Sequence, residues 1–159
     1  MQNDWLDEGA VHVLLPLNLL EKWHGSDSDD YDRACTVNGW LDLLSVGDGS
    51  ALVLGGDPGM VLADRQGDSV LLIRWIYADD EAELIRFARN GAATANPEPD
   101  VRFDNSWDQW RLFDAAVNPT RVEHAYRTVR LPIGPIQIRT ELLQSERNSA
   151  IVHRFVPLT

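Results

Sequence analysis

The chain has 159 residues, 44% of them hydrophobic, which is the composition of an ordinary globular domain and excludes a disordered protein. Its 25 acidic side chains outnumber 14 basic ones, a formal net charge of −11, which argues against nucleic-acid binding because phosphate contacts need clustered lysine and arginine. One cysteine excludes an intramolecular disulfide, and without a signal-peptide pattern or a run of about 18 apolar residues we expect a cytoplasmic protein with no membrane span.

The chain begins with patterns of a strand, a short helix and a hairpin. VHVLLP (residues 11–16) predicts a strand, and LNLLEKW after Pro16 predicts a short helix near residues 17–24. The stretch HGSDSDDYDRAC (residues 24–35), called the acidic segment below, is predicted to be a loop. WLDLLSV and ALVLG are apolar runs separated by GDGS, the pattern of a β-hairpin.

The run SVLLIRWIYA (residues 69–78) predicts a central strand, because both of its faces are largely apolar. Arg74 interrupts one of these faces. A buried guanidinium needs a carboxylate partner, so we expect Arg74 to be buried and paired. The candidate partners are Asp42, on a strand predicted to be its neighbour, and the aspartates of the acidic segment.

The remaining chain predicts one long helix and then several strands. DDEAELIRFARNG predicts a helix over residues 79–90, which Asp79 caps at its start and Gly91 closes. AATANPEPD (residues 92–100) is a polar connector. Strand-like runs follow, separated by turn residues: QWRLFDAA, HAYRTVRL, IQIRTELL and AIVHRFV.

These elements predict an α+β fold dominated by antiparallel β-sheet, either sandwich-like or strongly curved. Its helices are those near residues 17–24 and 79–90. We expect a single domain over residues 1–159, or two subdomains that meet near residues 91–100. Charge is uneven along the chain: residues 1–100 carry 19 acidic and 6 basic side chains, whereas residues 101–159 carry 6 acidic and 8 basic ones.

The acidic segment admits three interpretations: a metal site, a catalytic carboxylate pair, or a surface for a basic partner. Calcium in an EF-hand requires a central glycine and regularly spaced oxygen ligands, and Tyr31 and Asp32 break that pattern. The four histidines lack zinc-ligand spacing. We therefore expect no metal and no cofactor.

An enzymatic function would need a nucleophile and a base. Cys35 is the candidate nucleophile, with His24 or His124 as its base, although a single cysteine beside apolar neighbours is more often a small buried side chain. His153 alternates with Ile151 and Phe155 and is expected to face the core. Trp107 and Trp110, near Asp and Arg, have the composition of a binding hot spot, but core packing is also a common fate of tryptophan.

Several blocks of the sequence resemble the bacterial immunity protein family numbered twenty-one. These are VLLP followed by WHG, then DYDRAC, VGDG, ALVLGGDP and IRWIYADDEAEL, over residues 11–90. Weaker similarity continues in LFDAA, LPIG and HRFVPL, and the chain departs from the family pattern at Pro135. The resemblance implies a non-catalytic cytosolic protein of a polymorphic toxin system, which binds and neutralises a toxin domain.

This resemblance and the charge together predict a basic toxin as partner, with no nucleic acid and no membrane. The alternatives are a small enzyme with a pocket around His24 and Cys35, or a non-catalytic adaptor or structural protein. The predicted partner-binding residues are Asp27, Asp29, Asp30, Asp79, Asp80, Glu81, Glu83, Trp107 and Trp110. The predicted structural residues are Arg74, Asp32, Asp42 and Cys35.

Overall fold

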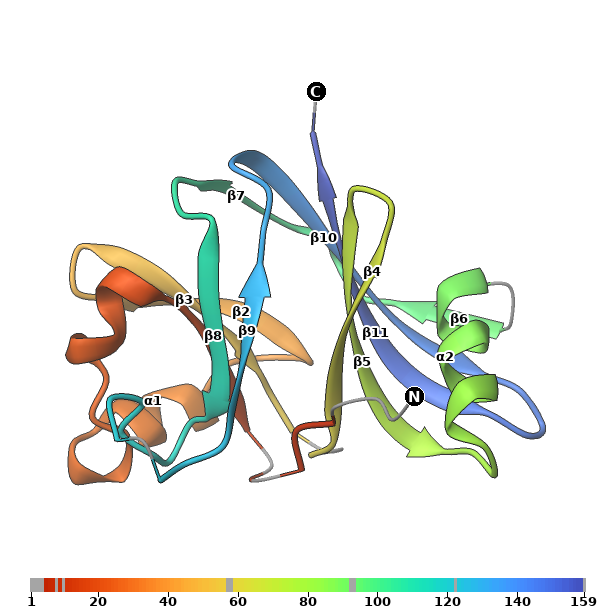
Figure 1. The fold of residues 1–159 in the computed structure, drawn as a ribbon, viewed down its shortest axis with the longest axis horizontal. Helices are drawn as coiled ribbons and strands as arrows, with labels where there is room; N and C mark the ends of the chain where they lie inside the picture. The colour runs from red at the N-terminus through yellow and green to blue at the C-terminus, as the bar shows by residue number, and fades with distance from the viewer. Residues whose placement is uncertain are drawn as a thin grey trace. The chain divides into compact units, whose positions relative to one another are not determined.

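The computed structural model describes residues 5–7, 9, 11–56, 59–91, 94–121 and 123–158. Within them, antiparallel β-sheet dominates and a few short helices accompany it, which confirms the predicted α+β class (Figure 1). The chain divides into two compact units. Unit 1 comprises Met1–Trp5, Met60–Ser106 and Pro132–Thr159, and unit 2 comprises Leu6–Gly59 and Trp107–Leu131.

Unit 2 is built on a five-stranded sheet with the order β2-β3-β1-β8-β9, in which every pairing is antiparallel. The strands are β1 (His12–Pro16), β2 (Leu41–Val46), β3 (Gly49–Leu54), β8 (Gln109–Asp114) and β9 (Tyr126–Arg130). The predicted first strand, the hairpin and the two strands after residue 108 are thereby confirmed. A two-residue turn at Gly47 and Asp48 joins β2 to β3, as GDGS predicts.

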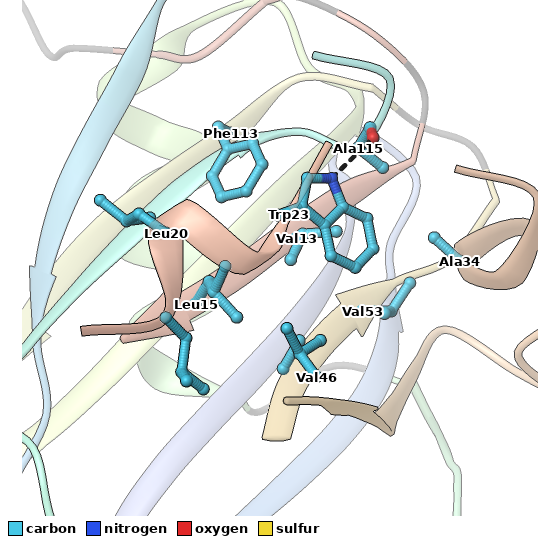
Figure 2. Close-up of a cluster of buried hydrophobic side chains, with 11 residues drawn as sticks. Val13, Leu15, Leu20, Trp23, Ala34, Val46, Val53, Phe113 and Ala115 are labelled. Atoms are coloured by element: carbon cyan, nitrogen blue, oxygen red, sulfur yellow. Dashed lines mark hydrogen bonds between the residues drawn. The ribbon is translucent and has the colours of Figure 1, made fainter. Parts of the chain in front are cut away.

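Three short helices cover one face of this sheet: η1 (Leu17–Lys22), η2 (Gly25–Asp27) and α1 (Asp30–Cys35). Figure 2 shows the core between them, where the Trp23 indole lies beside Phe113 with ring centroids 6.4 Å apart. Trp23 Nε1 donates to Ala115 O at 3.0 Å, which satisfies the one polar atom of the buried side chain. Trp23 therefore fixes the helical segment to the end of β8.

Unit 1 contains a six-stranded sheet with the order β4-β5-β11-β10-β6, in which β7 also pairs with β10. The strands are β4 (Val61–Gln66), β5 (Ser69–Tyr77), β6 (Thr94–Pro97), β7 (Val101–Asn105), β10 (Gly134–Gln144) and β11 (Ser149–Pro157). The prediction that β5 is central is confirmed, because β4 and β11 flank it. Its neighbour is therefore not β2, which belongs to the other sheet.

Helix α2 (Glu81–Asn90) packs on the sheet of unit 1 through Leu84, Ile85 and Ala88. Its N-cap is Asp80, whose side chain accepts from Ala82 N at 3.3 Å, one residue later than predicted. Gly91 has a left-handed backbone with φ of 59°, so it ends the helix as predicted.

Short polar elements were the ones that the sequence pattern did not predict. The acidic segment is not simply a loop, because it contains η2 and α1. Strand β6 lies in the predicted connector, and its Pro97 is tolerated because β6 is an edge strand. Residues 92–93 of that connector lie outside the described residues. Strands β4 and β7 also escaped prediction. VLADRQ of β4 has no period-two pattern, and the alternation in VRFDN of β7 extends over only five residues.

The predicted burial of individual side chains is confirmed on the strands but not on helix α1. Arg74 and His153 are fully buried, so their predicted core positions are confirmed. Cys35 is exposed, so its predicted burial is wrong: it occupies the last turn of α1, whose buried residues are Asp30 and Ala34. Asp42 is half-buried on β2.

Among the described residues, no helix combines the length and apolarity needed to span a bilayer.

Candidate functional site

The acidic segment is held on unit 2 by backbone contacts to the chain that follows β8. Ser26 N donates to Ala116 O at 2.9 Å, and Gly25 lies directly against the same residue. Ala34 in α1 is buried in the core that contains Trp23. The segment is thus anchored at both ends, and its polar side chains have defined positions.

Asp30 is the structural member of the aspartate cluster. It is only 8% exposed. Its Oδ2 accepts from His24 N at 2.9 Å, and its Oδ1 accepts from Arg33 Nη1 at 3.3 Å. Our prediction that Asp30 is an exposed binding residue is therefore wrong about its exposure. Its carboxylate accepts hydrogen bonds from His24 and Arg33 of the same segment.

Three other aspartates of the segment are exposed: Asp27, Asp29 and Asp32. Asp27 has a side chain that is 66% exposed, and Arg121 Nη2 lies 3.4 Å from its Oδ2. Because an exposed ion pair of this length contributes little stability, Asp27 can exchange Arg121 for another cation. Asp32, predicted to be structural, is exposed as well, since it lies on the outer side of α1.

The second predicted acidic patch is at the start of α2 in unit 1. Its members are Asp79, Asp80, Glu81 and Glu83. Glu81 accepts from Trp5 Nε1 at 2.6 Å, and Glu83 accepts from Asn148 Nδ2 at 3.2 Å. Asp79 and Asp80 remain exposed, although Asp80 also caps the helix. Three of the four carboxylates thus have partners within the chain.

A family model described as immunity protein 21 matches residues 4–149. The chain belongs to the immunity protein 21 family. No curated protein and no solved structure matches it.

The two predicted tryptophans of this immunity protein 21 family member differ in exposure. Trp107 is 48% exposed, whereas Trp110 is 3% exposed and donates from Nε1 to Trp107 O at 3.0 Å. Core packing therefore accounts for Trp110. Trp107 is the member of the pair that can contact a partner.

The residues of the alternative enzyme interpretation are both on the surface of this family member. His24 and Cys35 are exposed. The pKa of Tyr31 is raised, chiefly because its hydroxyl shares a hydrogen bond with Cys35. A helix N-terminus lowers the pKa of a thiol and so activates it, whereas Cys35 is the last residue of α1. In the described ranges, no three His, Cys, Asp or Glu side chains are grouped as a metal site.

Sequence reasoning missed two arginines that shape this surface. Arg121 comes from the connection between β8 and β9, and Arg33 reaches from α1 to Ser45 O on β2 at 2.6 Å. Arg33 carried a weak signal, since it is the one basic residue of the acidic segment. Arg121 carried none, because it is 94 residues from Asp27 in the sequence.

Proposed function

We propose that this protein neutralises a toxin domain of a polymorphic toxin system in the cytoplasm, by binding rather than by catalysis. The partner is a basic toxin domain, and the acidic segment is its principal contact. The recognition carboxylates are those of Asp27, Asp29 and Asp32. The observation that carries the proposal is their exposure on a segment that the core anchors, in a member of the immunity protein 21 family.

Charge supports the choice of a basic partner. Residues 6–59 of unit 2 carry 10 acidic and 2 basic side chains. Such a charge distribution steers a cationic protein during encounter, and the effect falls with salt because the Debye length is about 8 Å at physiological ionic strength. Exposed rim charges act mainly on the association rate.

Asp79 and Asp80 of unit 1 form a secondary candidate contact. Glu81 and Glu83 are weaker candidates, because Trp5 and Asn148 already occupy their carboxylates. Trp107 is proposed as an aromatic contact, since exposed tryptophan is enriched among interface hot spots.

The test replaces Asp27, Asp29 and Asp32 together by asparagine and measures association with the toxin domain encoded beside the gene. Stopped-flow traces at low and high salt separate the charge effect from other contributions. We expect slower association at low salt and a smaller difference at high salt, together with weaker protection of cells that express the toxin.

The matched control replaces three exposed acids of unit 1, Asp68, Asp104 and Glu146, by their amides, which changes the net charge equally. This control should associate more nearly like the wild type. If both triple variants slow association alike, net charge alone acts and the acidic segment is not the contact. If the wild-type protein binds no neighbouring toxin, the immunity function itself is refuted.

A further inference from the structure

Tyr126 is an exposed aromatic residue at the start of β9, the edge strand of the unit 2 sheet. It lies directly opposite Phe113 of β8, so both side chains project from the same face of the sheet. Phe113 belongs to the core between that face and the helices, and its ring centroid is 6.4 Å from that of Trp23. Tyr126 therefore lies on the helix-covered face of the sheet, at an edge where it stays 41% exposed.

The acidic segment lies at the same end of unit 2 as Tyr126. The segment begins at His24, directly after Trp23 in the chain. Arg121, in the connection that leads into β9, has its Nη2 atom 3.4 Å from Asp27 Oδ2. Figure 1 shows β9 starting at the end of unit 2 where α1 lies. Tyr126 and the carboxylates of the acidic segment are therefore neighbouring parts of one surface.

Trp107, the exposed aromatic residue already proposed as a contact, lies at the opposite end of β8. It precedes Gln109, the first residue of the strand, whereas the acidic segment meets Ala116, beyond the last residue. The strand has six residues, so its two ends are about 17 Å apart at about 3.4 Å per residue. Of the two exposed aromatic residues, Tyr126 is therefore the one next to the acidic segment.

The Tyr126 ring is held in position by Arg111 of β8. The Arg111 guanidinium lies over the ring, 4.0 Å from its centroid. Arg111 in turn donates from Nη1 to Pro119 O at 3.0 Å, in the connection between β8 and β9. A ring that is already held loses little conformational entropy when a partner covers it, so more of its packing energy contributes to binding.

A complex needs a packed anchor in addition to charge. Exposed carboxylates mainly accelerate encounter, whereas a few packed side chains, tyrosine prominent among them, supply most of the binding energy. The aromatic residue of the acidic segment itself, Tyr31, packs against the unit 2 core. We infer that Tyr126 is the aromatic anchor of the toxin contact. The toxin surface that fits carries an apolar side chain, which packs on Tyr126, flanked by lysine or arginine, which meet the recognition carboxylates. This inference rests on the proposed function and adds to it the anchor and the chemistry of the toxin surface.

The experiment measures the association and dissociation rates of the full chain with the toxin domain encoded beside the gene. Tyr126→Ala should leave association within about twofold and speed dissociation about tenfold, because the loss of a packed anchor acts on dissociation. Tyr126→Phe keeps the ring and should dissociate like the wild type. The matched control, Tyr77→Ala, removes a tyrosine of similar exposure, 38%, from unit 1 and should also dissociate like the wild type.

If Tyr126→Ala does not fold, Tyr126→Thr takes its place, because threonine is favoured in strands. A folded variant that dissociates at the wild-type rate overturns the inference, and so does equal acceleration in Tyr77→Ala. In both cases the toxin still binds, so the proposed function stands. If the wild-type chain binds no toxin, the proposed function fails and the inference fails with it.

Discussion

Thr140 and His153 face each other in register on β10 and β11, and Thr140 Oγ1 shares a hydrogen bond of 2.8 Å with His153 Nδ1. Both residues are buried, and His153 Nε2 has no hydrogen-bond partner among the described residues. Burial lowers the pKa of His153 well below its ordinary value, and the positive charge of Arg74 adds to this effect. The unit 1 core therefore holds a neutral imidazole.

This histidine predicts a loss of stability in mild acid. The folded pKa is depressed, so below the unfolded value of about 6.5 the unfolded chain binds a proton that the folded chain does not. The resulting loss approaches about 1.4 kcal/mol per pH unit until the folded pKa is reached. Urea midpoints between about pH 7.5 and pH 5 should show this slope, since histidine titrates in that range. His153→Asn should flatten this pH dependence, whereas His24→Asn, at an exposed site, should leave it unchanged. Identical slopes in the wild type and both variants would contradict the assignment of the slope to His153.

The burial of Arg74 predicts a large effect of its truncation. Arg74→Ala should lower the free energy of unfolding by roughly 3–5 kcal/mol, because it empties a fully buried volume and leaves the groups around the guanidinium without it. Arg74→Met keeps most of that volume and should cost less. Chemical denaturation measures both, and an unchanged midpoint for the alanine variant would refute the prediction. The carboxylate partner of Arg74 stays a prediction.

Alanine substitutions of two neighbouring aspartates in the acidic segment should lower the free energy of unfolding by different amounts. Asp30→Ala removes the acceptor of His24 N and of Arg33, so it should cost about 1–3 kcal/mol. Asp29→Ala changes an exposed side chain without a cap hydrogen bond and should stay within about 0.5 kcal/mol. Thermal unfolding of the two variants checks this. Equal destabilisation would show that the segment does not depend on Asp30.

The two-point contact between Arg89 and Asp64 predicts that the free energy of unfolding depends modestly on the shape of the guanidinium group. Arg89 Nε and Nη2 each donate at 2.8 Å to one carboxylate oxygen, which lowers the pKa of Asp64. Arg89→Lys keeps the charge but loses the two-point contact, and should cost about 0.5–1 kcal/mol because the arginine is partly exposed. Arg86→Lys, on an exposed position of the same helix, is the control and should cost less. The Asp64 contribution is present above about pH 4 and is lost as pH falls through the lowered pKa.

Two glycines with the same backbone conformation should respond differently to alanine. Gly25 and Gly67 have φ of 60° and 62°, so each Gly→Ala change costs about 1–2 kcal/mol of left-handed strain. At Gly25 the added methyl would also press against the backbone of Ala116, whereas nothing lies within 4 Å at Gly67. Gly25→Ala should therefore destabilise markedly more, and it should loosen the acidic segment. Equal shifts in melting temperature would argue against the close approach of the two backbones.

Local patterns in the sequence determined the elements whose side chains repeat with a clear period. The apolar faces of β5, the GDGS turn of the β2–β3 hairpin and the caps of α2 are all encoded within a few residues. The acidic composition of the first 100 residues is likewise a property of the sequence alone. These features need no knowledge of which strands become neighbours.

Tertiary structure decided which of the charged residues support the fold and which are exposed. Asp30 and Asp29 are adjacent aspartates, yet only Asp30 accepts from a backbone N–H and from Arg33, because Asp30 lies on the buried side of α1. Arg121 can reach Asp27, and Arg33 can reach Ser45 O on β2, only after the sheet has formed with β3 and β8 on the two sides of β1. Sheet order depends on contacts between distant segments, and local periodicity carries no record of them.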